Sequence, residues 1–372
     1  MAGETTVIKP DLQFVQRVIA AGGDTVKKCY QCDTCSVVCG PTPDSKPFPR
    51  KEMLQAQWGL KDVVKDPDIW LCHHCSDCTV YCPRGAKPGE VMNALRKLCI
   101  EHYAAPPQLA RMVGDAKFLP VLIAFPVILL ALAASMFGYL GIPEGEIVYS
   151  KMFPTLLIDA IFTSAAAFAV LVLARGVMAF WKDINAASPW TVKVQGSLVG
   201  DLLATIKDIL WHNRFRECET TFKRSTNHLF VLFGFIFLAG VTGLAFIHEW
   251  FEEPHSVTKL YVVMKLLAIP GTAALLYGIY NILTERQANA AKAGYGSYYD
   301  WLFIYVVFAV GATGLLSWLF RLLHLSVLAY PIYFIHLTSV FFLFFYAPYT
   351  KMAHFVYRTV AMLWARMASR GF

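Results

Sequence analysis

Six long apolar stretches limit what most of this 372-residue chain can fold into. The clearest runs from Leu229 to Ile247 and contains no charged side chain. At about 1.5 Å of rise per residue, a helix of this length crosses the hydrocarbon core of a bilayer. Because lipid offers no hydrogen-bond partners, such a segment must form a helix. The stretches long enough to span are roughly 118–140, 154–181, 227–249, 257–284, 298–320 and 325–357.

The charges beside these stretches predict their orientation. Six spans leave both ends of the bundle on one side of the membrane. Basic residues gather between the second and third spans and in the C-terminal tail, whereas the loop after the first span is acidic at Glu144 and Glu146. The positive-inside rule therefore predicts a multi-pass protein of the cytoplasmic membrane with both ends in the cytoplasm. No apolar segment of signal-peptide length precedes residue 24, which agrees with this orientation.

The formal net charge of +7 follows from the same distribution of basic residues. Lys and Arg concentrate beside the spans, where they contact lipid headgroups and the aqueous surface. We therefore expect contact with membrane lipid and no nucleic-acid partner.

Eight of the ten cysteines form two copies of one pattern. The first run is Cys29-x2-Cys32-x2-Cys35-x3-Cys39, and the second is Cys72-x2-Cys75-x2-Cys78-x3-Cys82. A reducing compartment disfavours disulfides, and four cysteines within eleven residues suit a cubane cluster better than zinc. In two-cluster ferredoxins the fourth cysteine of each run binds the cluster of the other run.

The spacing therefore predicts two [4Fe-4S] clusters. The predicted ligands are Cys29, Cys32, Cys35 and Cys82 for the first cluster, and Cys72, Cys75, Cys78 and Cys39 for the second. Cys99 and Cys218 lie outside the pattern and are expected to be ordinary thiols. His73 and His74 lie inside the second run, but four cysteines already complete each ligand set.

Composition and motifs together predict an all-α protein. Residues 1–105 are expected to form a soluble, helical, ferredoxin-like two-cluster domain in the cytoplasm. Residues 106–117, which begin with Pro106-Pro107, form a linker. Residues 118–372 form a six-helix transmembrane bundle.

Four histidines at the ends of predicted spans are candidate haem ligands. Ionisable side chains are costly inside apolar spans, so they indicate function. His228 and His248 bracket the third span, and His336 and His354 lie in the sixth, ~30 and ~27 Å apart along a helix. Because these spans are antiparallel, we expect His228 to face His354 near the cytoplasm and His248 to face His336 near the outer surface. Each pair would hold one haem b, which makes two haems.

Several assignments stay open at this point. His255 and His324 lie on the same side as His248 and are alternative ligands for the outer haem. His212 is expected to be a loop residue. Lys265 in the fourth span either extends its ammonium group to the membrane surface or binds a quinone carbonyl or haem propionate.

The two parts in this order resemble a known family. Paired cysteine runs followed by six spans are similar to the membrane-bound C subunit of the quinone-interacting membrane-bound oxidoreductase (Qmo) complex of sulfate reducers. In that family a part similar to the C subunit of heterodisulfide reductase is fused to a part similar to its E subunit. His336-Leu337 and the run from Pro348 to His354 resemble the haem-binding helix of the respiratory nitrate reductase cytochrome b subunit. That protein has a second histidine ten residues after the first in its other haem helix, where this sequence has Leu238.

The resemblance implies oxidation of menaquinol and electron transfer through haem b and the clusters. The implied partners are flavin- and iron–sulfur-containing cytoplasmic proteins similar to the A and B subunits of Qmo, with adenylylsulfate reductase as the electron acceptor. A heterodisulfide-reductase-like or sulfite-reductase-linked membrane subunit would use the same cofactors. A non-catalytic membrane anchor is a further alternative, although an anchor does not need histidines at four span ends. The sequence has no G-x-G-x-x-G fingerprint between a strand and a helix, so flavin chemistry is expected on a partner.

Overall fold

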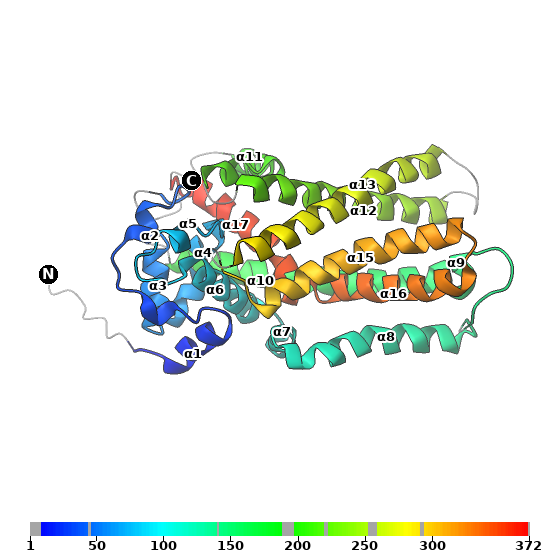
Figure 1. The fold of residues 1–372 in the computed structure, drawn as a ribbon, viewed down its shortest axis with the longest axis horizontal. Helices are drawn as coiled ribbons and strands as arrows, with labels where there is room; N and C mark the ends of the chain where they lie inside the picture. Colours follow the sequence, from blue (N-terminus) through cyan, green and yellow to red (C-terminus); the bar gives the residue numbers. More distant parts are fainter. Residues whose placement is uncertain are drawn as a thin grey trace.

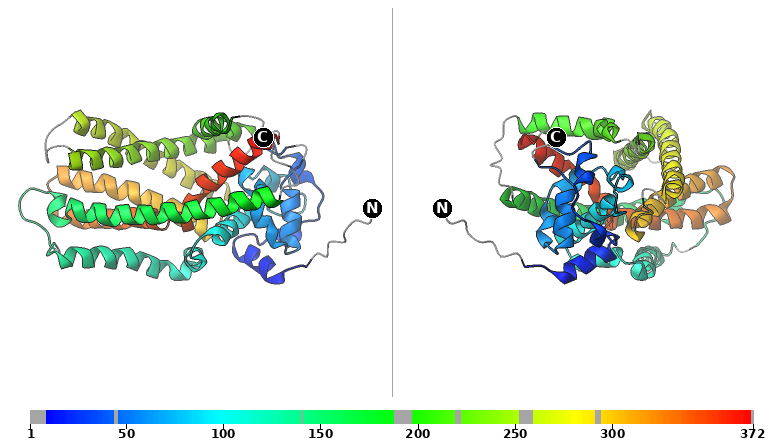
Figure 2. Two further views of the ribbon diagram at one scale, coloured as in Figure 1. Left: turned by 180° about the vertical axis from the view of Figure 1, so that it is seen from behind. Right: turned by 60° about the vertical axis from the view of Figure 1, so that its left-hand side comes forward.

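The computed structural model describes residues 9–43, 46–139, 141–187, 197–218, 222–251, 259–290 and 294–370. Within these ranges the protein is helical and contains no strand. Short helices form a compact domain at one end, and long helices extend away from it (Figures 1 and 2). Six of the described helices are long and apolar enough to cross a membrane. The predicted all-α fold class with six spans is therefore confirmed.

The six long helices are packed side by side. They are α8 (Leu119–Met136), α10 (Thr155–Ala187), α12 (Phe222–Phe251), α13 (Lys259–Ala288), α15 (Tyr298–Leu322) and α16 (Ser326–Phe345). Helix α12 packs on α13, α13 on α15, α15 on α16, and α16 on both α10 and α8. Trp250 Nε1, at the far end of α12, donates to Asp159 Oδ2 on α10 at 2.6 Å. This bond links α12 to α10 and connects the two sides of the bundle.

The N-terminal domain is built around one central helix. It comprises α1 (Leu12–Ala20), α2 (Thr34–Val37), α3 (Arg50–Gln57), α4 (Asp68–Leu71), α5 (Asp77–Val80) and α6 (Pro88–Tyr103). Helix α6 starts at Pro88. Proline suits the first turn of a helix because N–H groups there have no acceptor within the helix, so the lack of an N–H costs no hydrogen bond. Val91, Leu95 and Leu98 recur at helical spacing and are buried. Helices α2 and α5 each begin inside one of the cysteine runs.

One hydrophobic core runs through the N-terminal domain and the adjoining ends of the long helices. The C-terminal helix α17 (His354–Met367) packs on α4, where Tyr357 stacks on Trp70 with ring centroids 5.3 Å apart. Residues Pro107–Val113 of the expected linker form helix α7, whose Ala110 and Val113 are buried in this core. The hydrophobic core therefore continues past residue 106, where the amino-acid composition changes.

The end of the predicted sixth span is wrong. Helix α16 stops at Phe345, and two short 3-10 turns, Ala347–Tyr349 and Lys351–Ala353, precede α17. Pro348 lacks an N–H and disfavours helical conformation in the residue before it, which favours a break in the helix here. The Thr350 hydroxyl accepts a hydrogen bond from the Met352 N–H at 3.3 Å, and the chain changes direction at this turn. His354 therefore begins α17 and does not lie in the sixth span.

Two further segments lie between α10 and α12 at the same end as the N-terminal domain (Figure 1). Helix α11 (Leu198–Trp211) packs on α17, and the 3-10 helix η4 (Asn213–Glu217) follows it directly. The C-terminus also lies at this end. Parts of the chain that are far apart in sequence therefore meet around the cysteine runs.

We expect Arg370→Ala to weaken the attachment of the C-terminal segment. Arg370 Nη1 donates to Asp68 Oδ1 at 2.7 Å, and both side chains are almost completely buried. Removing the guanidinium leaves the Asp68 carboxylate with Lys51, whose Nζ lies 2.7 Å from Oδ2. Because Lys51 remains, we expect a loss of about 3 kcal/mol, at the low end for a broken buried pair. Thermal unfolding in detergent, followed by loss of visible cluster absorbance, measures this loss.

Arg111→Ala is the matched control. Arg111 also pairs with a carboxylate, Glu101, at 2.7 Å, but its side chain is exposed, so at most ~1 kcal/mol is expected. Equal unfolding midpoints for the two variants would contradict a stabilising role for the buried pair.

Candidate cluster and histidine sites

The eight patterned cysteines lie around two separate hollows. One hollow is lined by Cys29, Cys32, Cys35 and Cys82, and the other by Cys39, Cys72, Cys75 and Cys78. Each set combines three cysteines of one run with the fourth of the other, which is the arrangement of two-cluster ferredoxins. Four convergent thiols fit a [4Fe-4S] cluster, since its irons take thiolate ligands. We call these sets the outer and the inner cysteine groups, respectively.

Both cysteine runs have the same backbone conformation. The left-handed residues are Gln31, Asp33, His74 and Ser76, with φ of 60°, 68°, 53° and 73°. Non-glycine residues seldom adopt this conformation, and turns of this kind direct backbone N–H groups into a concave loop. The N–H of Gln31 donates to Cys29 Sγ at 3.5 Å, and the N–H of His74 donates to Cys72 Sγ at 3.3 Å. Each loop is thus shaped to stabilise negative charge on sulfur.

The two groups differ in burial. Cys72, Cys75 and Cys78 of the inner group are at most 8% exposed, whereas Cys32 of the outer group is exposed. Burial is the main reason that the pKa of Cys78 lies well above its ordinary value. A buried thiolate is therefore stable only beside positive charge, which bound iron supplies. The outer group lies where a soluble redox partner can approach.

Three arginines from separate helices surround the second cysteine run. Arg96 of α6 and Arg358 of α17 both donate to the Cys72 carbonyl oxygen, the latter at 2.9 Å. Arg224 of α12 donates to the His74 carbonyl oxygen at 2.6 Å. Their positive charge favours an anionic cluster in the inner group.

His228 and His354 lie together next to this run. Their ring centroids are 6.4 Å apart, with His228 in the second turn of α12 and His354 at the start of α17. His354 Nδ1 bonds the Lys351 carbonyl oxygen at 2.5 Å, and His228 Nδ1 bonds His212 Nε2 at 2.7 Å. Because a carbonyl oxygen can only accept, His354 donates from Nδ1 and its Nε2 lone pair is available for a metal, as is usual for metal-binding histidines. The bond between His228 and His212 likewise involves Nδ1 of His228.

This pair could hold one metal ion between its two rings. Metal–nitrogen bonds of about 2 Å would place the ring centres of two imidazole ligands roughly 6 Å apart, close to the distance between these two rings. Burial lowers the pKa of His354 to about 3, so its imidazole is neutral at physiological pH and able to bind metal.

His212 is a site residue that sequence analysis missed. It caps the C-terminus of α11 in a left-handed conformation, is buried, and holds His228 through the bond described above. Burial lowers its pKa to about 4, so it too is neutral. Sixteen residues separate it from His228, and no spacing rule connects the two positions.

His336 and His248 contact different neighbouring helices. His336 Nδ1 lies 3.1 Å from Thr313 Oγ1 on α15, whereas the His248 ring lies 6.4 Å from Tyr261 on α13. Lys265 is exposed, and its ammonium group lies 4.5 Å from the centre of the Tyr261 ring.

Two other histidines, His324 and His255, were alternative ligands for the outer haem. His324 is exposed at the end of α15. His255 lies outside the described residues.

Aromatic rings connect the inner cysteine group to the histidine pair. His73, which follows Cys72, stacks on Phe215 of η4 with ring centroids 4.9 Å apart. Phe215 stacks on His212 at 4.9 Å and lies 6.1 Å from the His228 ring. Sequence analysis missed Phe215, because no motif marks it.

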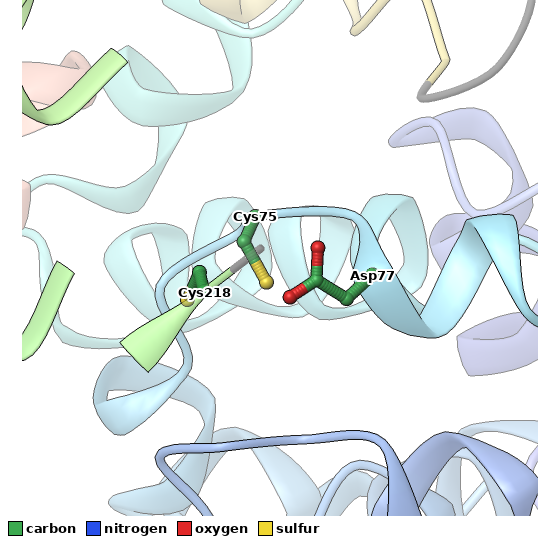
Figure 3. Close-up of side chains that lie close together, drawn as sticks. All are labelled: Cys75, Asp77 and Cys218. Carbon is green, nitrogen blue, oxygen red and sulfur yellow. The ribbon is translucent and has the colours of Figure 1, made fainter. Parts of the chain in front are cut away.

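Cys218, expected to be an ordinary thiol, lies beside the inner group. Figure 3 shows its side chain next to those of Cys75 and Asp77, and the potential ligand atoms of all three lie within 4.8 Å of one another. Cys99 instead accepts from Trp70 Nε1 at 3.3 Å within the core.

Comparison with known proteins supports an iron–sulfur domain. The family described as "4Fe-4S dicluster domain" matches residues 25–86. The C subunit of the H(2):CoB-CoM heterodisulfide,ferredoxin reductase of Methanothermobacter marburgensis is 36% identical over 88 residues, 23% of this chain and 47% of that protein. An iron–sulfur C subunit of the CoB–CoM heterodisulfide reductase of Methanocaldococcus jannaschii is 35% identical over 96 residues, 24% of this chain and 52% of that protein. The chain thus spans about half the length of these relatives.

A different relative matches along almost the whole chain. Citrate utilization protein B of Escherichia coli is 26% identical over 365 residues, 92% of this chain and 91% of that protein. No solved structure matches. The chain therefore joins a two-cluster electron-transfer domain, related to the C subunit of heterodisulfide reductase, to a membrane-type helical region that resembles citrate utilization protein B.

Paired cysteine variants test the ligand sets. Cys29→Ala and Cys82→Ala each remove a ligand of the outer group, so their combination should lose no more iron than either alone, about four atoms. Cys29→Ala combined with Cys39→Ala should lose both clusters. Iron analysis with electron paramagnetic resonance (EPR) of the reduced protein measures this. Loss of all iron from the Cys29/Cys82 pair, with retention of half in the Cys29/Cys39 pair, would assign each cluster to a single run.

Proposed function

We propose that the chain is the membrane subunit of a quinone-dependent oxidoreductase, transferring electrons between menaquinone in the membrane and cytoplasmic partner subunits. The observation that carries this proposal is the row of ring contacts from His73 through Phe215 to His228. It joins the inner cysteine group to a pair of histidines whose hydrogen bonds, within the described part of the chain, are made through Nδ1. A structural anchor has no need of this arrangement.

The histidines are proposed to hold haem b, which when bound supplies one-electron redox chemistry. His228 and His354 are the ligands near the cytoplasm, oriented by His212 and by the Lys351 carbonyl oxygen. Neutral imidazoles at these positions bind iron without first losing a proton. We propose His248 and His336 as ligands of a second haem. The contact between His336 Nδ1 and Thr313 supports this proposal, because it leaves Nε2 of that ring for iron.

The quinone site is proposed to include Lys265. Its ammonium group is exposed on α13 near Tyr261, which itself adjoins His248. A lysine there can donate a hydrogen bond to a quinone carbonyl oxygen, and its positive charge can stabilise negative charge on that oxygen as the quinone is reduced. Quinol gives up two electrons, whereas haems and clusters each accept one, so both kinds of site are required.

The soluble partners are proposed to dock at the outer cysteine group. Proteins related to the N-terminal domain are subunits of heterodisulfide reductases, so flavin- and iron–sulfur-containing subunits are the expected partners. By resemblance to the Qmo complex, adenylylsulfate reductase is the proposed final acceptor. We also propose that residues 1–105 and both termini face the cytoplasm, that 106–117 connect the two parts, and that 118–372 form the six-span domain of the cytoplasmic membrane with its C-terminal end on the cytoplasmic side.

The similarity to citrate utilization protein B favours a second candidate function. In it the same cofactors transfer electrons between quinone and a soluble partner during citrate utilization. A heterodisulfide-reductase-like or sulfite-reductase-linked subunit differs in the partner alone. Reduction of the clusters by menaquinol, followed by oxidation by adenylylsulfate reductase, favours the first proposal. Failure of that oxidation favours the others.

Haem content tests the histidine assignments. We expect His228→Ala and His354→Ala each to lose about one equivalent of haem b, because each removes an axial ligand. His336→Ala and His248→Ala should each lose the other equivalent. Reduced-minus-oxidised spectra and haem analysis of the purified full-length protein measure both losses.

His102→Ala is the matched control, since His102 lies in α6 away from the bundle interior and contacts Tyr103. It should keep all haem. Full haem in both His228→Ala and His354→Ala would contradict the inner pair. Absence of haem from the wild type, with no quinol-driven cluster reduction, would support the anchor alternative.

A further inference from the structure

We propose that Cys218 is a positioning residue whose thiol donates a hydrogen bond to Cys75 Sγ and thereby raises the reduction potential of the cluster in the inner group. The proposal rests on the inner ligand set described above and is independent of haem or quinone. Cys218 lies outside both cysteine runs, separated from Cys75 by more than one hundred residues.

The geometry brings the two sulfur atoms together in a dry environment. Cys218 is 2% exposed and Cys75 is 8% exposed. Cys218 Sγ, Cys75 Sγ and a carboxylate oxygen of Asp77 lie within 4.8 Å of one another (Figure 3). Without water to compete, a weak S–H donor has a larger electrostatic effect than at a surface.

The chain holds Cys218 in place through its backbone. Cys218 follows η4, and its N–H donates to the Phe215 carbonyl oxygen at 3.4 Å. Gly40, which follows Cys39 of the inner group, lies so close to Glu217 that a Cβ atom would be 2.4 Å from the Glu217 carbonyl oxygen. Only glycine permits this approach. The loop that carries Cys218 therefore packs on Gly40, the residue after Cys39, and lies beside Cys75.

The neighbouring imidazole determines where the thiol proton points. His73 Nδ1 lies 3.6 Å from Cys218 Sγ, and no described residue provides a partner for His73 Nε2. The tautomer with its proton on Nδ1 leaves only a lone pair unpartnered at Nε2, rather than a buried N–H group. In that tautomer His73 donates to Cys218, so the Cys218 proton does not point to His73 and is available for Cys75.

A hydrogen bond to a cluster ligand stabilises the reduced form, which carries one more negative charge. It therefore raises the reduction potential. Because η4 also carries Phe215, one short segment both contacts the histidine pair and sets the potential of the nearest cluster.

The test is an EPR-monitored redox titration of the full-length protein in detergent with both clusters present. In Cys218→Ala we expect one cluster to have a lower potential and the other to be unchanged. A shift on the order of tenfold in the equilibrium constant for reduction corresponds to ~59 mV for one electron. Cys218→Ser keeps a donor and should stay near the wild type. Cys99→Ala, the same change at a buried cysteine that lines neither hollow, should shift neither potential.

Two outcomes would overturn the proposal. One is unchanged potentials in Cys218→Ala with full iron content. The other is loss of about four irons in that variant, which would make Cys218 a ligand or a purely structural residue.

If Cys218→Ala does not fold, pulsed EPR of the wild type and Cys218→Ser in light and heavy water decides. Backbone N–H groups couple to both clusters in both proteins. A further exchangeable-proton coupling at one cluster that differs between the wild type and Cys218→Ser therefore supports the hydrogen bond, and identical couplings in the two proteins refute it. None of these readouts depends on haem content or on reaction with quinone. Failure of this proposal can therefore be told apart from failure of the proposed function.

Discussion

The arrangement of this protein depends on the hydrogen bonds that three buried arginines make to the second cysteine run. Arg96, Arg358 and Arg224 come from α6, α17 and α12, and they donate to carbonyl oxygens within two residues of one another. Each guanidinium is costly to bury, and carbonyl oxygens together with anionic sulfur are the partners that offset this cost. The run thereby becomes the point where the N-terminal domain, the C-terminal helix and the helical bundle meet.

This convergence explains why the hydrophobic core continues across residue 106, where the amino-acid composition changes. Trp70 stacks on Tyr357, and Tyr103 donates to Asp183 at 3.0 Å, so the N-terminal domain is packed onto α17 and the near end of α10. A rigid contact suits electron transfer, since the rate depends on fixed distances between cofactors. The same contact leaves the outer cysteine group at the surface and the inner group beside the histidines.

The break after α16 has a functional consequence. A helix continued through Pro348 would carry His354 along the axis of the sixth span. The 3-10 turns instead place Lys351 against Asp300 and Asn93, and they orient His354 through the Lys351 carbonyl oxygen. Asp300 also accepts from Asn93 Nδ2 at 2.8 Å, so a polar network joins α15, α6 and the start of α17. The position of His354 is therefore determined by tertiary contacts.

Sequence alone determined the helical class, the number of spans and the repeated cluster motif. Helical rise and bilayer thickness are constants, and short spacers between cysteines leave few ways to surround a cubane, so local patterns suffice for these features. It also singled out His228, because histidines are rare in apolar segments, and His354, which it placed in a sixth span longer than the helix proves to be. Only the tertiary structure decided that His354 begins a separate helix, that His212 bonds His228, and that Phe215 and Cys218 lie against the inner cysteine group. Some of these contacts join residues more than a dozen positions apart, and others join residues more than one hundred apart. They depend on how the helices pack, and no local periodicity in the sequence indicates that packing.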